Sequence, residues 1–253
     1  MHDSRRRVAQ YDRLVTTSAE RREELRSVYV QARACTRCPP LASTRTQVVF
    51  GAGNADADLM FVGEAPGAKE DEQGIPFVGA AGKLLDELLA GVGLARADVF
   101  VANVLQCRPP GNRDPLPGEI DDCQDWLMRK VDLIQPRVIC TLGNFATKLL
   151  RGDPTGISRL HGQAEIITIG NRAVRLYPLY HPAAALYTRS LLDTLRADVG
   201  RLPALLQMDP PAQPEVEVEA IAEPELASEP EPHTPDWASP GDGQSPDRQL
   251  GLF

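Results

Sequence analysis

Short apolar runs alternate along this chain with amphipathic stretches, and this alternation restricts the fold more than any other feature. Leu59-Met60-Phe61-Val62 is predicted to be a buried strand, and 99–101 and 138–142 are predicted to be two more. Between the strands, 82–89 and 119–134 carry apolar residues at helical spacing. Strands that alternate with helices form a largely parallel sheet covered on both faces. The sequence therefore predicts an α/β fold, a three-layer sandwich with a central, mostly parallel sheet flanked by helices.

The remaining predicted elements extend this pattern to both sides. They are a helix from Ser18 to Ala32 capped by Thr17 or Ser18, a helix over 144–150, strands over 166–169 and 174–177, and a closing helix over 191–207. Residues 1–17 carry the consecutive arginines Arg5, Arg6 and Arg7 and show little periodicity, which predicts a flexible arm. The predicted organisation is this arm, a catalytic domain over 18–207, and a tail over 208–253.

The tail differs sharply in composition from the rest of the chain. Residues 209–253 hold nine prolines, eleven Asp or Glu and one Arg, a charge of 1 − 11 = −10. Such a segment buries too little apolar surface to offset its ordering entropy, so we predict disorder. The whole chain has 27 Lys or Arg and 35 Asp or Glu, so residues 1–208 carry 26 − 24 = +2. A mildly basic body remains compatible with a nucleic-acid partner.

The chain offers no secretion or membrane signal. Its first residues lack the apolar core of a secretory signal, and no run approaches the roughly 18 apolar residues that span a bilayer. We therefore expect a cytoplasmic protein, without a membrane partner and monomeric. In that compartment the five cysteines are expected to be reduced thiols or metal ligands.

Three polar loops follow predicted strands. They are 63–67, 103–115 and 180–182. In open α/β sheets, ligands bind beyond the carboxyl ends of the strands, so these loops are expected to meet at one site. Each loop alone is also compatible with an ordinary turn or cap.

These loops carry a family resemblance in their order and spacing. The motifs are Gly63-Glu64-Ala65-Pro66-Gly67 with Glu70-Asp71, 74–79 (GIPFVG), 103–110 (NVLQCRPP) and His181-Pro182. Together they resemble the signature segments of the iron–sulfur (type 4) uracil-DNA glycosylases, over nearly all of residues 20–207. The resemblance implies an enzyme that flips uracil out of single- or double-stranded DNA and hydrolyses its N-glycosidic bond, leaving an abasic site.

The resemblance also implies roles for the loop residues. Asn103 would read the base edge, because its amide can donate to uracil O4 and accept from N3–H, whereas cytosine presents the reverse pattern. Phe77 would stack on the base beside Gly63. His181 would reach uracil O2 and stabilise the negative charge on the departing base. A capping Asn, a core Phe and a core His are the structural alternatives.

Glu64 is the acid that the resemblance assigns to orienting the attacking water and stabilising a cationic sugar. Conventional uracil glycosylases hold an Asp and a Tyr in this loop, where this chain has Ala65 and Gly67. Exclusion of the thymine methyl group must then come from elsewhere, and Glu70 is our candidate.

Four cysteines form a second group of candidate functional residues. Cys35 and Cys38 make a C-x-x-C turn, and Cys107 and Cys123 are separated by fifteen residues. Four thiolates suit zinc or a [4Fe–4S] cluster, and the spacing leaves both open. The resemblance implies the cluster, in a structural role that pins the N-terminal helix to the Asn103 loop. Cys140 lies inside a predicted strand and is expected to be a buried hydrophobe.

Two further contacts are predicted. Arg108, Arg113 and Arg189 are candidates for DNA phosphate or minor-groove contacts. The apolar end of the polar tail resembles the peptide by which bacterial repair proteins dock on the sliding clamp. It consists of Gln249, Leu250, Gly251, Leu252 and Phe253.

Two other functions compete with this interpretation. Covalent uracil-DNA-binding relatives carry Gln where this chain has Ala65, and a basic insertion after the Asn loop, so turnover is favoured. A non-enzymatic iron–sulfur carrier would explain the cysteines but not the three loops.

Overall fold

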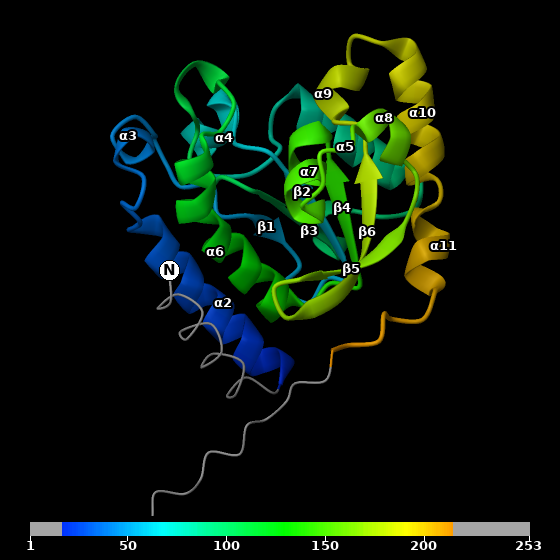
Figure 1. The fold of residues 1–253 in the computed structure, drawn as a ribbon, viewed down its shortest axis with the longest axis horizontal. Coiled ribbons are helices and arrows are strands. Elements are labelled where there is room, and N and C mark those ends of the chain that lie inside the picture. Colours follow the sequence, from blue (N-terminus) through cyan, green and yellow to red (C-terminus); the bar gives the residue numbers. More distant parts are fainter. Residues whose placement is uncertain (1–16, 215–253) are drawn as a thin grey trace, which may run out of the picture. The chain divides into compact units, whose positions relative to one another are not determined.

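The computed structural model describes residues 17–214 and has a six-stranded sheet at its centre (Figure 1). The strand order is β1-β3-β2-β4-β6-β5. Pairing is parallel among β3, β2, β4 and β6, and antiparallel at the two edges, where β1 and β5 lie. The strands are β1 (Ala52–Gly53), β2 (Leu59–Gly63), β3 (Val99–Asn103), β4 (Val138–Leu142), β5 (Glu165–Ile169) and β6 (Arg172–Leu179). The predicted, mostly parallel sheet is confirmed.

Helices connect the strands and cover the sheet. They are α2 (Ser18–Arg33), α3 (Pro39–Ala42), α4 (Ala68–Gln73), α5 (Ala80–Ala90), α6 (Pro117–Ile134), α7 (Asn144–Arg151), α8 (Ile157–Leu160), α9 (Pro182–Ala185), α10 (Arg189–Val199) and α11 (Leu202–Gln207), with 3-10 turns η1 (Arg96–Asp98) and η2 (Pro110–Asn112).

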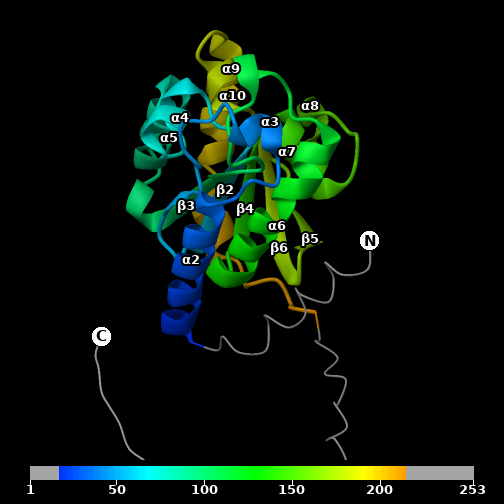
Figure 2. The same ribbon diagram turned by 90° about the vertical axis from the view of Figure 1, so that its left-hand side faces the viewer.

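The sheet has an apolar core on each face, because successive residues of a strand point to opposite sides. In β2, Met60 and Val62 join the core beneath α2, α6 and α7, whereas Leu59 and Phe61 join the core beneath α5, α10 and α11. Figures 1 and 2 show α2 and α6 on one side of the strands and α10 on the other. The three-layer arrangement is therefore confirmed.

The closing helix differs from its prediction. The sequence predicts one helix over 191–207, but the chain forms α10 and α11 with Gly200 and Arg201 between them. Pro203 explains the break, because proline has no N–H to donate and its ring clashes with the carbonyl four residues earlier. Pro203 instead lies in the first turn of α11, where proline is tolerated.

Helix α2 begins as its sequence predicts. The Thr17 hydroxyl accepts from the Glu20 N–H at 3.2 Å, and the Glu20 carboxylate accepts from the Thr17 N–H at 2.9 Å. This capping box satisfies donors that the first turn leaves without helical partners. Between residues 17 and 214, no helix is both long and apolar enough to cross a membrane.

Candidate active site and thiol cavity

The carboxyl ends of three parallel strands bring the polar loops together. Gly63 at the end of β2 pairs with Asn103 at the end of β3, and the Val104 N–H donates to the Gly63 carbonyl at 2.9 Å. His181 follows β6, and its side chain would be 3.1 Å from a Cβ placed on Gly143 at the end of β4. These contacts place the three loops at one edge of the sheet, as the sequence predicts.

Asn103 is buried and lacks one hydrogen bond. Asn103 is only 2% exposed, and its side-chain oxygen Oδ1 has no hydrogen-bond partner. A Cβ on Gly63 would lie 2.4 Å from this oxygen and 2.7 Å from the ring of Phe77, so only glycine allows the close approach. Because an unpaired buried acceptor costs about 1–3 kcal/mol, Oδ1 is suited to a ligand that brings an N–H donor.

Phe77 is held beside Asn103 in an unusual backbone conformation. Its φ is +54°, in the left-handed region, and its ring stacks on His181 at 5.7 Å between centroids. Arg96 donates from Nη2 to the Phe77 carbonyl at 2.7 Å and is itself paired through Nε with Asp86 at 2.8 Å. These contacts hold the backbone that carries the ring, and no local sequence motif predicts them.

Glu70 holds the other side of the same turn. Its Oε1 accepts from the backbone N–H groups of Val78 and Gly79 at 3.0 and 2.9 Å. A Cβ on Gly67 would meet Glu70 Oε2 at 2.8 Å, so Glu70 fills the space next to Gly67. This carboxylate therefore shapes the loop around Phe77, and its predicted part in excluding thymine stays a prediction.

His181 is positioned as a neutral hydrogen-bond donor. Its Nδ1 accepts from the Ala183 N–H at 3.1 Å at the start of α9, so the ring proton is assigned to Nε2. Burial lowers the pKa of His181 to about 4, and the carboxylate of Glu70 opposes this shift only in part. Around neutral pH the imidazole is uncharged and Nε2–H is available to a ligand.

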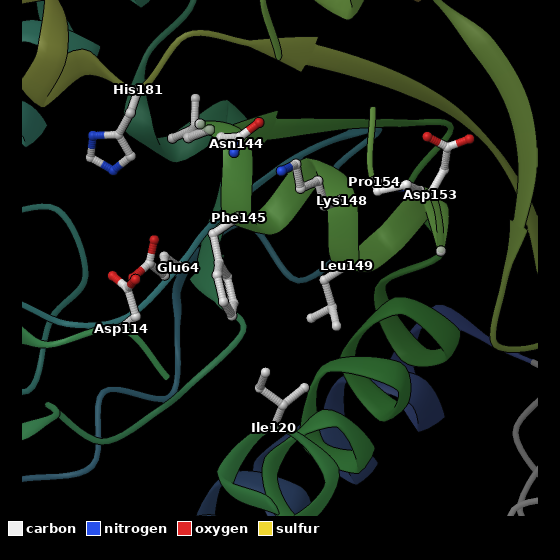
Figure 3. A pocket seen from close by; sticks show the side chains of 13 residues that line it. Glu64, Asp114, Ile120, Asn144, Phe145, Lys148, Leu149, Asp153, Pro154 and His181 are labelled. Atoms are coloured by element: carbon white, nitrogen blue, oxygen red, sulfur yellow. The ribbon is translucent and has the colours of Figure 1, made fainter. Parts of the chain in front are cut away.

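Glu64 and His181 line a common cavity of about 680 Å³ (Figure 3). Burial raises the pKa of the Glu64 carboxyl above its ordinary value, and the nearby Asp114 carboxylate raises it further. Lys148 and Phe145 of α7 line the same cavity, whereas Asn103 and Phe77 do not. The predicted residues thus form two adjacent groups, with Asn103, Phe77 and Gly63 in a tight cluster and Glu64 at the open cavity.

The three arginines predicted to contact DNA differ in how far other residues of the protein already bind them. Arg113 makes two hydrogen bonds to the Glu119 carboxylate, at 2.9 and 2.6 Å. Arg108 donates to Asn112 at 2.7 Å, and Arg189 is exposed at the first turn of α10. Arg113 is therefore the least available of the three to a phosphate, and all three roles stay predictions.

Several residues near the cavity were missed by the sequence analysis. Asp114 and Lys148 lie in a predicted loop and helix without a distinguishing motif. Ligands in open α/β sheets bind beyond the carboxyl ends of the strands, and this strand-end rule, applied also to β4, indicates Gly143 and α7. Leu186 and Tyr187 follow His181 closely and are 41% and 90% exposed, a signal that only the structure provides.

Four of the five cysteines line a second cavity, and Cys140 lies apart from them in the opposite core. The cavity is lined by Cys35, Cys38, Cys107 and Cys123 together with Arg45, Gln106 and Trp126, among others. Burial raises the pKa of Cys38 to about 12, and the neighbouring Cys123, Asp122, Cys107 and Cys35 add to the shift. The four predicted ligands are therefore gathered in space.

The surroundings of this cavity suit sulfur ligands. Arg45 donates to Cys107 Sγ at 3.2 Å, and the Gln106 N–H donates to Cys123 Sγ at 3.4 Å. Within residues 17–214, no three His, Cys, Asp or Glu side chains are arranged to hold a single metal ion. A donor set of four thiols with nearby N–H donors fits an iron–sulfur cluster in its chemistry.

Comparisons with known proteins identify relatives of this chain. Residues 50–200 match the Uracil DNA glycosylase superfamily. The type-4 uracil-DNA glycosylase of Archaeoglobus fulgidus is 44% identical over 184 residues, which cover 71% of this chain and 92% of that protein. The type-4 enzymes of Sulfurisphaera tokodaii and Thermotoga maritima are 40% and 43% identical, covering 71% and 67% of this chain and 84% and 87% of theirs.

Proposed function

Because the chain belongs to the type-4 uracil-DNA glycosylases of the uracil-DNA glycosylase superfamily, we propose that it repairs DNA by excising uracil. It binds uracil-containing DNA, flips the uracil out and hydrolyses the N-glycosidic bond, leaving an abasic site. The observation that carries this proposal is the unpaired Oδ1 of buried Asn103, next to a ring able to stack on a base.

Asn103 supports selection of uracil over cytosine. Its unpaired Oδ1 would accept from uracil N3–H, and its amide nitrogen would donate to O4. Cytosine offers an acceptor at N3 and donors at its amino group, so it would leave the amide wrongly paired. Phe77, fixed by Arg96, would provide the stacking surface.

His181 supports departure of the base. The bond between sugar and base breaks with negative charge growing on uracil, and a neutral Nε2–H aimed at O2 would stabilise that charge. Neutrality also matters in this step, because a charged imidazolium would repel the positive charge that develops on the sugar as the bond breaks.

Glu64 supports attack by water on the sugar. As a carboxylate it would orient the water and stabilise positive charge on the sugar. Because the raised pKa of Glu64 extends its protonated form to higher pH, this step requires a pH above that pKa. Exclusion of thymine is assigned to the loop that Glu70 holds against Gly67.

We propose a [4Fe–4S] cluster as the resident cofactor, with zinc as the alternative. Its ligands would be Cys35, Cys38, Cys107 and Cys123, which already line one cavity. When bound, the cluster supplies four strong iron–thiolate bonds that tie the end of α2 to the loop after Asn103. Visible absorbance near roughly 400 nm in freshly purified protein, with matching iron and sulfide content, would support the cluster over zinc.

Contacts with DNA would come from the rim of the site. Arg108 and Arg189 are the freer candidates for phosphates, and Arg113 would have to leave Glu119 to join them. The exposed Leu186 and Tyr187 are suited to fill the space that a flipped base leaves in the stack.

The N-terminal arm (1–17), the tail (208–253) and the clamp peptide remain sequence-based proposals, since 1–16 and 215–253 lie outside the described residues. We propose that the glycosylase domain over 18–207 acts as a cytoplasmic monomer, and that 249–253 tethers it to the sliding clamp. A linker of some 40 residues has a reach of roughly 30–40 Å, enough to raise its local concentration on replicated DNA. Deleting 249–253 should abolish clamp binding in a titration without changing uracil release from a free oligonucleotide.

The proposed activity is tested with a uracil-containing single strand followed by alkali. Strand cleavage supports the glycosylase, a retarded covalent band supports a capturing relative, and neither result supports the non-enzymatic carrier. Asn103→Ala is the matched control, because it removes the recognising amide and should leave the uracil strand intact on the same timescale.

A further inference from the structure

Two buried side chains beside the thiol cavity carry polar atoms without partners. Gln106 is 2% exposed and Trp126 is 4% exposed, and both line the cavity with the four cysteines. Neither the Gln106 amide, at Nε2 and Oε1, nor the Trp126 indole nitrogen Nε1 has a hydrogen-bond partner. Each buried donor left unpaired costs about as much free energy as a lost hydrogen bond. Such donors are therefore expected to have an acceptor when the protein is complete.

The unpaired groups are rich in donors. A Gln amide brings two N–H hydrogens and a Trp indole brings one, against a single carbonyl oxygen. Sulfur in thiolates and cluster sulfides only accepts, so it complements this set. Two other donors already point at sulfur here, because Arg45 donates to Cys107 and the Gln106 backbone N–H donates to Cys123.

The position of each group in the chain supports the same partner. Gln106 directly precedes Cys107, and Trp126 lies three residues after Cys123, almost one turn along α6. The indole is held in place by the guanidinium groups of Arg37 and Arg129, which lie 4.6 and 5.4 Å from its ring centroid. Each donor is thus fixed next to a proposed ligand by the chain itself.

We propose that the Gln106 side-chain amide and the Trp126 indole N–H donate hydrogen bonds to the sulfur atoms of the iron–sulfur cluster. They retain the cluster and make it easier to reduce, because N–H donors stabilise the more negative, reduced form. This inference rests on the proposed cofactor and assigns positioning roles to two residues that are not ligands.

The test replaces Gln106 by Met, which keeps the length of the side chain and removes both polar atoms. In the loaded protein, the loss of absorbance near 400 nm in excess chelator should be roughly two- to tenfold faster than in the wild type, the factor that one ordinary hydrogen bond contributes. The reduction potential, measured by voltammetry, should become more negative. Gln124→Met is the matched control: this glutamine adjoins Cys123 but is exposed and does not line the cavity, so both readouts should stay at wild-type values.

The outcomes separate this inference from the cofactor proposal. A wild-type protein purified without iron and sulfide would overturn the cofactor and this inference with it. A loaded wild type together with unchanged retention and potential in Gln106→Met would overturn the inference alone. If Gln106→Met gives no soluble protein, Trp126→Phe removes the indole N–H and keeps an aromatic ring between the arginines, and an unchanged potential in that variant would equally overturn it.

Discussion

The charge state of His181 can be tested through the pH dependence of uracil release. Burial lowers the pKa of His181 to about 4, so its neutral form should persist well below neutral pH. At pH 5, a histidine with a pKa near 4 is about 90% neutral, whereas one with the ordinary pKa of about 6.5 is about 3% neutral. The two cases differ roughly 30-fold in the concentration of the form that donates from Nε2 without carrying a charge.

Glu64 must be removed from this experiment, because its raised pKa produces an acid limb of its own. The assay is therefore a single-turnover measurement with Glu64→Gln between pH 5 and pH 8. We expect the residual rate to change by less than about twofold over this range. A fall of about 30-fold with a midpoint near pH 6.5 would refute the neutral, buried histidine. His181→Asn in the same background is the control and should be slower at every pH, with no added acid limb.

Three other perturbations test the remaining parts of the site. Asn103→Ala should slow single-turnover uracil release on the order of a hundredfold or more, since losing a contact that strengthens as the base departs costs about 2.7–4 kcal/mol; a wild-type rate would contradict its role. Arg96→Met should weaken substrate binding about tenfold or more, measured as KM, because charged hydrogen bonds of about 1.5–3 kcal/mol no longer hold the stacking ring. Asp86→Asn keeps those bonds and should have the smaller effect, so equal effects would contradict the argument. Cys123→Ala should lower the soluble yield and bleach the absorbance near 400 nm whereas Cys140→Ala should do neither, and the opposite result would refute the ligand set.

Much of the fold could be predicted because the central strands are buried on both faces. Leu59–Val62 is apolar throughout and 138–142 is apolar except for Thr141, which distinguishes both runs from the amphipathic helices between them. Elements too short to show an apolar run or a helical repeat could not be predicted in this way. β1 has two residues, and α3, α8 and α9 have four each, too few to show a repeat.

The candidate site was predictable to the extent that it lies at strand ends. Parallel pairing brings Gly63 and Asn103 together although they are 40 residues apart, and the strand-end rule anticipates this. The rule carries no information on which loop side chains meet, so the approach of Asp114 to Glu64 was not foreseen. Neither was the positive φ of Phe77, whose carbonyl accepts a hydrogen bond from Arg96, a tertiary contact that no local pattern indicates.

The separation of the four clustered thiols along the chain has a consequence for biosynthesis. Cys35 and Cys38 leave the ribosome 88 and 85 residues before Cys123, the last of these four thiols to emerge. At about 5–20 residues per second, this delay lasts about 4–17 s. During that interval the C-x-x-C pair is a bare dithiol, open to stray metal ions and to oxidants. Faster translation therefore shortens the period in which the pair is exposed, and a lower oxidant load makes its oxidation within that period rarer.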